Sequence, residues 1–160
     1  MSSRSGITVG FSQTQFNVRT PFSMPMNGFR RPQHIRIVGV CKAIPCRHND
    51  FSVIFRSSYN EHLFSFKQQF DTFSVALSSS RHGPWKDESN GCDYPWDDIP
   101  SPFHVDKVFT LDFVAREDDI VVNHNGHHFY TFKTGSCCGE IRSMEISGNI
   151  EVHAVHALSR

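Results

Sequence analysis

The chain has 160 residues, of which 38% are hydrophobic and 20% charged, and its 16 basic residues equal its 16 acidic ones. This length suits one compact domain with a hydrophobic core and is too short for two ordinary domains. Because the formal net charge is zero and the charges are interspersed, the composition favours neither nucleic acid nor an anionic membrane, and a neutral ligand is the natural partner.

The N-terminal segment, residues 1–20, is rich in Ser, Thr, Gln and Gly and shows no sustained apolar period, which predicts a flexible tail. No apolar run of signal-peptide or membrane-spanning length follows, so we expect a cytoplasmic protein with no membrane insertion. The five cysteines are an odd number, and a domain of this size needs no disulfide staples, so we expect reduced thiols.

Short β-rich runs recur from Ile35 onward, about every eight to twelve residues, and no long segment has the helical spacing of apolar residues. The predicted strands cover residues 35–40, 51–55, 62–66, 73–77, 108–115, 119–123, 128–132, 144–147 and 150–156. Turn residues separate these runs, and Asn125-Gly126 is the strongest hairpin signal among them. The pattern predicts an all-β domain built as an antiparallel sandwich or barrel.

Two neighbouring strands of this set, within residues 63–78, alternate apolar and polar side chains, which places the two kinds on opposite faces. The predicted core side carries Phe64, Phe66, Phe70, Phe73, Val75 and Leu77. The predicted solvent side carries Ser65, Lys67, Gln69, Ser74, Ala76 and Ser78. The alternation therefore predicts a flat polar face above an apolar core.

A tight turn and then Trp85-Lys86-Asp87-Glu88 follow the two strands. A sugar ring has an apolar C–H face and an equator of hydroxyls, so it is best held by one aromatic plate and several hydrogen-bonding groups. Trp85 can supply the plate and Glu88 an ionised acceptor, which predicts a sugar-binding groove. The alternatives are that Trp85 is a core or rim aromatic and that Glu88 is an ordinary surface carboxylate.

These motifs resemble those of the galectins, the soluble β-galactoside-binding lectins. The galectin strand Phe-His-Phe-Asn-Pro-Arg-Phe corresponds to residues 64–70, where the aromatic frame is kept and all three sugar ligands are changed. The family's Trp-Gly-x-Glu-x-Arg corresponds to residues 85–90, where Trp and Glu are kept. Similar segments, in the family's order, are residues 21–22, 35–39, 102–103, 109–111, 125–128 and 146–150.

The resemblance implies a carbohydrate-recognition domain over residues 21–158, folded as an antiparallel two-sheet jelly-roll sandwich of the concanavalin-like type. It implies a carbohydrate site on the concave face, composed of Trp85, Glu88, Ser65, Lys67, Gln69, Ser78 and Asn90. It also implies that the protein reaches the outside by a non-classical route in addition to the cytoplasm, and that a homodimer is a candidate assembly.

Five ligand positions differ from the family's pattern. The family's His, Asn, Arg, Asn and Arg are replaced by Ser65, Lys67, Gln69, Ser78 and Asn90, so two guanidinium groups are lost. We therefore expect weak or absent lactose binding and an altered specificity for a glycan or glycoprotein. The alternative is a sugar-incompetent module of the same fold that acts through protein contacts.

Lys67 adds a cation that would favour an acidic glycan, although exposed strand lysines usually only solvate a face. The segment of residues 90–100 is longer than the family spacing and carries Tyr94 and Trp96. Aromatic residues in such a loop suit either recognition or packing against the sandwich.

Histidines at positions 124, 127, 128, 153 and 156 do not complete a recognised metal spacing, so we expect no metal and no cofactor. Glycoside hydrolysis needs two facing carboxylates, whereas Asp87 and Glu88 are strand neighbours that point to opposite sides. No local motif for Ser/His/Asp or Cys/His chemistry is present either. We therefore expect a binding protein and not an enzyme.

Overall fold

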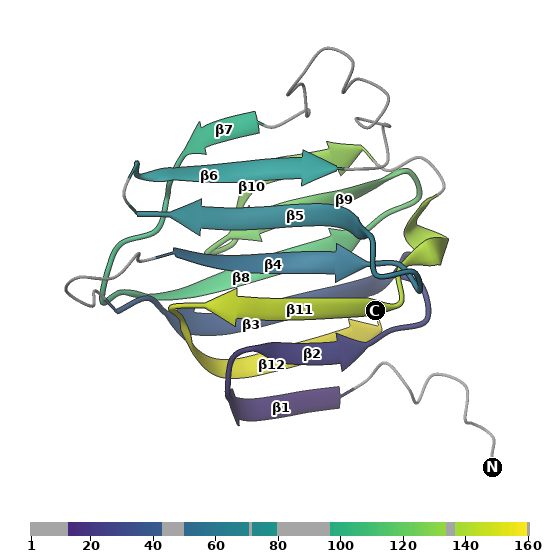
Figure 1. Ribbon diagram of the computed structural model, residues 1–160, viewed down its shortest axis with the longest axis horizontal. Coiled ribbons are helices and arrows are strands. Elements are labelled where there is room, and N and C mark those ends of the chain that lie inside the picture. The colour runs from purple at the N-terminus through teal and green to yellow at the C-terminus, as the bar shows by residue number, and fades with distance from the viewer. Residues whose placement is uncertain (1–12, 43–49, 71, 80–96, 134–136, 160) are drawn as a thin grey trace.

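Two antiparallel six-stranded sheets pack face to face in the computed structural model (Figure 1), which describes residues 13–42, 50–70, 72–79, 97–133 and 137–159. The first, here called the β5 sheet, runs in the order β2 (Phe22–Pro25), β11 (Ser143–Gly148), β4 (Asp50–Arg56), β5 (His62–Gln69), β6 (Ser74–Ser79) and β7 (Asp97–Pro100). The second, the β3 sheet, runs in the order β1 (Gln13–Val18), β12 (Glu151–Ser159), β3 (Gln33–Val40), β8 (Val108–Ala115), β9 (Asp119–His124) and β10 (His127–Lys133). One short 3₁₀ helix, η4 (Cys137–Glu140), precedes β11.

The predicted all-β architecture is confirmed, and each of the nine predicted runs lies in a strand, with small differences at the ends. The hairpin prediction is also confirmed, because Asn125 and Gly126 join β9 to β10 with φ angles of 51° and 85°. Two successive positive φ angles match the right-handed twist of a tight hairpin, and Asn-Gly adopts them at low cost.

Strands β1, β2 and β7 are short edge strands that the apolar pattern does not predict. Strand β1 lies within residues 1–20, the segment expected to be a flexible tail, and pairs along its length with β12. The described sandwich therefore begins at Gln13, before the expected boundary at residue 21. Most of β1 is exposed and only Val18 packs against the core, so backbone hydrogen bonds rather than an amphipathic pattern define it. Strand β7 lies at the end of the segment of residues 90–100 and pairs with β6.

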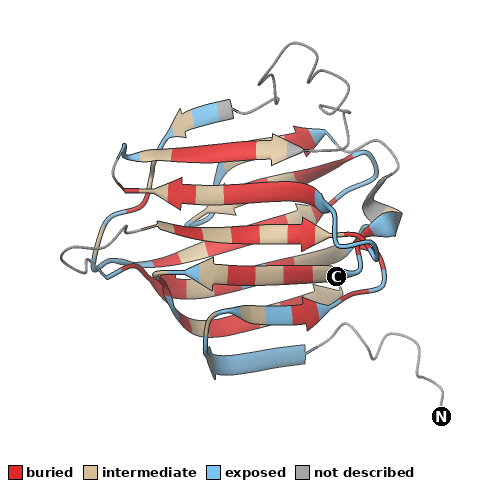
Figure 2. Ribbon diagram, viewed as in Figure 1, coloured by how far each residue is buried: buried red, intermediate tan, exposed pale blue. Residues whose placement is uncertain are grey.

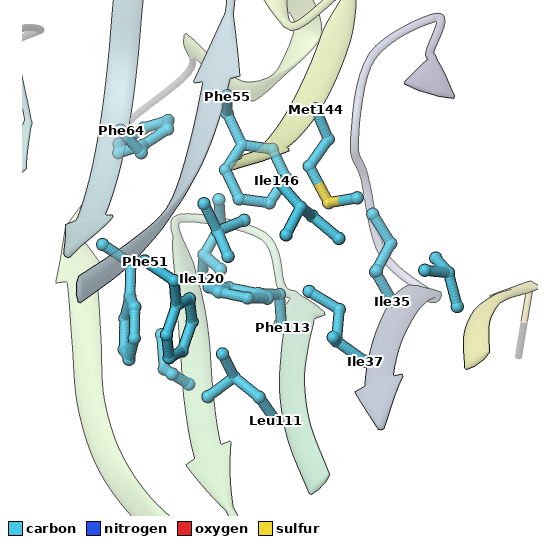
Figure 3. Close-up of a cluster of buried hydrophobic side chains, with 14 of the residues drawn as sticks. Ile35, Ile37, Phe51, Phe55, Phe64, Leu111, Phe113, Ile120, Met144 and Ile146 are labelled. Atoms are coloured by element: carbon cyan, nitrogen blue, oxygen red, sulfur yellow. The ribbon is translucent and has the colours of Figure 1, made fainter. Parts of the chain in front are cut away.

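Phenylalanine rings dominate the core between the sheets (Figure 3). Phe51 of β4 stacks on Phe109 of β8, with ring centroids 5.7 Å apart and planes 9° apart. Phe55 of β4 meets Phe113 of β8 edge to face at 5.3 Å. These contacts join opposite sheets, and aromatic pairs in such geometry add to the gain from burial itself. Strands β4 and β11 colour red and tan in alternation in Figure 2, as expected when one face of the sheet is buried.

One residue predicted to face the core does not. Phe73 is 67% exposed, and its φ angle of 51° places it in the turn before β6 instead of in the strand. Its ring contacts only the edge region of the core, with its centroid 6.5 Å from that of Phe70. Gln68 is the converse case, because the strand period turns this polar side chain into the core, where it is fully buried. Its Oε1 accepts a hydrogen bond from Ser101 Oγ at 2.7 Å.

A β-bulge at Leu63 shifts the order of side chains at the start of β5. Phe55 of β4 pairs with Phe64, but the next residue, Arg56, pairs with His62, so Leu63 is an extra residue. Leu63 and Phe64 are both buried although they are consecutive. The bulge thereby directs His62 to the same face as Ser65, as an extra residue in one strand does.

Candidate functional site

The outward face of the β5 sheet carries the predicted polar row. Ser65, Lys67 and Gln69 alternate along β5 with buried Phe64, Phe66 and Gln68, so they share the face away from the core. Ser78 of β6 lies directly opposite Ser65 in the strand register. The structure thus brings four of the seven predicted site residues together. We call the outward surface of the β5 sheet around these four residues the polar face.

The remaining three predicted residues, Trp85, Glu88 and Asn90, lie outside the described residues. So do Tyr94 and Trp96 of the longer segment, of which only the last four residues, strand β7, are described. The described part of the candidate site therefore consists of side chains of β4, β5 and β6.

The most buried residues of the polar face have small side chains. Ser65 keeps only 9% of its surface exposed and Ala76 of β6 keeps 7%, although both point away from the core. Their neighbours in register are longer, since Ile54 of β4 lies opposite Ser65 and Lys67 lies opposite Ala76. Short residues therefore lie beside longer ones on neighbouring strands at the centre of this face.

Lys67 is the one cation among the four predicted site residues on this face, and a nearby carboxylate partly neutralises its charge. Its Nζ lies 3.8 Å from Oδ2 of Asp50 on β4, and its side chain is 45% exposed. An exposed ion pair of this length stabilises by at most about 1 kcal/mol, so the ammonium can exchange this partner for another at little cost. The lysine therefore remains available to a ligand.

Gln69 and Ser74 form the far end of the polar face. The Ser74 hydroxyl donates to Gln69 Oε1 at 3.4 Å, a long bond, and shares a second, shorter one of 2.7 Å with Thr72 Oγ1. These positions are opposite each other in the register of β5 and β6. The Gln69 amide nitrogen remains as a donor at this end.

A charged cluster that the sequence pattern does not predict lies at the other end of the same face. Arg56 of β4 donates from Nε and Nη2 to Oε1 of Glu145 on β11, at 3.0 and 2.7 Å. His62, turned outward by the bulge, lies beside this pair. Its pKa is lowered, first by burial and then by the Arg56 charge, while Glu145 acts in the opposite direction. The sequence signal that could have revealed the outward position of His62 is Leu63-Phe64, two adjacent apolar residues that break the apolar–polar alternation.

Several polar groups of this face already satisfy one another. Ser52 of β4 shares a 3.1 Å hydrogen bond with Ser147 of β11, on the strand next to that of Lys67.

Within the described ranges, no three His, Cys, Asp or Glu side chains are arranged to hold a metal ion. No helix in that same part of the chain has the length and apolar character needed to cross a membrane. The chemistry that this face offers is hydrogen bonding and weak charge pairing.

Comparison with known proteins gives a consistent result. The family model described as galactoside-binding lectin matches residues 15–157 of the chain. Galectin LEC-6 of Caenorhabditis elegans is 25% identical, with a TM-score of 0.77 over 96% of this chain and 99% of that one. No curated protein matches the chain.

More distant solved structures share the fold. Sheep galectin-11, in complex with glycerol, is 14% identical, with a TM-score of 0.73 over 88% of this chain and 99% of that one. A variant of human galectin-16 is also 14% identical, with a TM-score of 0.74 over 91% of this chain and all of that one.

Proposed function

Because this chain belongs to the galactoside-binding lectin family, the galectins, we propose that the polar face of its β5 sheet binds a carbohydrate with a specificity other than the family's. The observation that carries the proposal is the row of Ser65, Lys67 and Gln69 on one face of β5, with Ser78 of β6 opposite Ser65. Sugar hydroxyls need donors and acceptors in a row of this kind. Trp85 would supply the aromatic plate, and Glu88 and Asn90 further polar groups.

The replaced ligands set the expected strength of lactose binding. Hydrogen bonds to charged groups contribute roughly 1.5 to 3 kcal/mol and neutral ones about 0.5 to 1.5 kcal/mol. A lectin that binds a small sugar between millimolar and micromolar has only about 4 to 8 kcal/mol in total. Losing two bidentate arginines therefore removes a large part of that free energy, and lactose should bind weakly or not at all.

Lys67 points to the glycan class that fits best. Its side chain is half exposed, and its contact with Asp50 is long at 3.8 Å. A carboxylate or sulfate on a glycan would offer the ammonium a closer partner and a charge-assisted hydrogen bond. An acidic glycan is therefore the preferred ligand class within this proposal.

One observation favours a second candidate function, a protein-interaction module that binds no sugar. Arg56 with Glu145 and Ser52 with Ser147 pair with each other, which leaves fewer free groups for sugar hydroxyls than an open lectin groove would offer. A protein surface could cover these satisfied pairs without breaking them.

A glycan array that includes neutral, sialylated and sulfated glycans separates the two functions. It is applied to the wild type, to Trp85→Ala and Lys67→Ala, and to Thr110→Ala on the opposite sheet as the control. The proposal expects signals on the wild type and the control that fall in both groove variants, with Lys67→Ala losing chiefly the acidic glycans. A blank array for the folded wild type would refute sugar binding and favour the protein-interaction function.

A further inference from the structure

A pocket of about 390 Å³ opens at the end of the β3 sheet, away from the polar face. Two segments line it, namely the connection from β7 to β8 and the turn from β9 to β10. Its polar lining consists of His104, Lys107, His124, Asn125 and His127. Phe109, at the start of β8, contributes an apolar wall.

His124 is fixed at the back of this pocket. It is the last residue of β9 and continues the inward side set by buried Ile120 and Val122. Its ring meets Phe103 edge to face at 4.8 Å and lies nearly parallel to Phe109 at 6.5 Å. One imidazole is thus held by packing, whereas His104 and His127 stand exposed at the mouth.

The titratable side chains that line the pocket are all basic. None of the described carboxylates lines the pocket, and none makes an ion pair with Lys107. The nearest acid in sequence, Asp106, faces Lys42 instead, with 4.0 Å between Nζ and Oδ1. Asn125 Oδ1 accepts a hydrogen bond from Thr110 N at 2.8 Å, so its amide nitrogen is the group left to donate. The lining therefore offers N–H donors and no free carboxylate.

We infer that this pocket binds a compact oxyanion, a carboxylate, sulfate or phosphate group, held by Lys107, His104 and His127 in front of the His124 and Phe109 wall. An ammonium and several N–H donors around one cavity suit oxygen anions, because charge-assisted hydrogen bonds are the stronger kind. The apolar wall excludes water on one side and so strengthens each of these interactions.

Proton uptake accompanies this binding. The pKa of His124 is lowered, first by burial and then by the neighbouring His104 and His127, which repel a third positive charge. Besides these imidazoles, the charged group on the pocket wall is Lys107, and Asn125 is neutral. A bound anion offsets the repulsion and favours the protonated form of His124, so affinity rises as the pH falls.

The test is a titration of the folded chain with sodium sulfate at constant ionic strength, followed by NMR of the histidine ring resonances. It is run at about pH 6 and about pH 8, on either side of the usual imidazole pKa. We expect saturable shifts at His104, His124 and His127, with binding about tenfold tighter at the lower pH. A parallel titration with glucuronate tells a sugar-borne carboxylate from a free inorganic anion, and saturation by either supports the site.

Two double variants give matched controls. His104→Gln with Lys107→Met changes two exposed residues of the pocket and should weaken binding by at least about tenfold. His153→Gln with Lys133→Met makes the same chemical change elsewhere on the β3 sheet and should leave binding unchanged. Absence of saturation with both anions at both pH values, or equal affinity in the pocket variant and the wild type, would overturn the inference.

Discussion

Gly148, at the end of β11, and Gly126, in the β9–β10 turn, both have positive φ angles, 103° and 85°, but only Gly148 is crowded. An added Cβ at Gly148 would clash with the Asp50 carbonyl oxygen, whereas nothing lies within 4 Å of the equivalent atom at Gly126. Gly126→Ala should therefore cost only the backbone strain, about 1 to 2 kcal/mol. Gly148→Ala should cost about 3 kcal/mol or more, because strain and clash add. Urea unfolding of the two variants measures the difference, and equal losses would contradict the crowding.

Cys41 is a buried thiol whose pKa is raised to about 12 by burial. At about pH 8 roughly one such thiol in 10⁴ is ionised, against a substantial fraction for an ordinary cysteine, and only the thiolate is nucleophilic. We expect iodoacetamide to label Cys41 at least about 100-fold more slowly in the folded chain than in urea. Peptide mass spectrometry reads this position separately from the other cysteines, and fast labelling of the native protein would be the contrary result.

His124 should make stability depend on pH. Its folded pKa lies below the usual value of 6.5, so the unfolded chain binds more protons between those two values. The contribution to stability is thus fully present above about pH 7 and is lost as the pH falls from 6.5 through the folded pKa. The lowered pKa of His62 acts in the same direction.

A His124→Leu variant isolates this effect, because leucine fills a similar volume beside Phe103 and cannot be protonated. Urea unfolding in chloride buffer at about pH 7.5 and about pH 5.5 should show a larger loss of free energy in the wild type than in the variant. Parallel pH profiles for the two proteins would mean that His124 does not contribute.

At the scale of the elements, the strands with a clear buried face were predictable, whereas the edge strands β1, β2 and β7 were not. Strand β8, for example, alternates buried Phe109, Leu111 and Phe113 with outward residues, and its predicted bounds are those of the structure. Strand β1 buries almost nothing and exists through its pairing with β12, a long-range contact that local pattern cannot encode. The periodicity of apolar residues in a sequence reflects the burial of one face of an element. A strand that is held only by backbone pairing therefore leaves no such pattern in the sequence.

Strand β5 shows the same limit for the candidate site. The order of Ser65, Lys67 and Gln69 followed from the period of two. The outward position of His62 did not, because it depends on the bulge at Leu63 and thus on the pairing with β4. The partners of Lys67 and Arg56, which are Asp50 and Glu145, come from neighbouring strands and appear only once the strand order is known.

Restoring the family's ligands on this scaffold tests whether the polar face is a lectin groove with replaced contacts. The variant combines Ser65→His, Lys67→Asn, Gln69→Arg, Ser78→Asn and Asn90→Arg. Two recovered charged donors at roughly 1.5 kcal/mol or more each should strengthen lactose binding by at least about a hundredfold, measured by calorimetry. The control is the same set with Trp85→Ala, which should abolish the gain, and no gain without that change would show that the frame itself differs.

At the scale of the whole molecule, one aromatic core joins the two sheets. The stacked pair Phe51 and Phe109 spans it, with centroids 5.7 Å apart. In a double-mutant cycle of Phe51→Leu and Phe109→Leu, we expect a coupling of about 0.5 to 1.5 kcal/mol in the free energy of unfolding. Phe64→Leu with Phe109→Leu is the comparison, since Phe64 packs on Phe132 instead and should be additive. A coupling near zero in the first cycle would mean that the stack adds nothing beyond burial.

The pairing of β1 with β12 brings the two ends of the described chain to one edge of the sandwich, with Gln13 opposite Ala157. The described part of the backbone is therefore almost a closed loop. Because its two ends are close together, we expect that the fold does not depend on the position in the strand order at which the chain begins. A circular permutant with the old ends joined by a short linker and new ends cut between Ser58 and Tyr59, in the β4–β5 turn, should keep both sheets. Tyr59 is 86% exposed, so the cut disturbs no core contact.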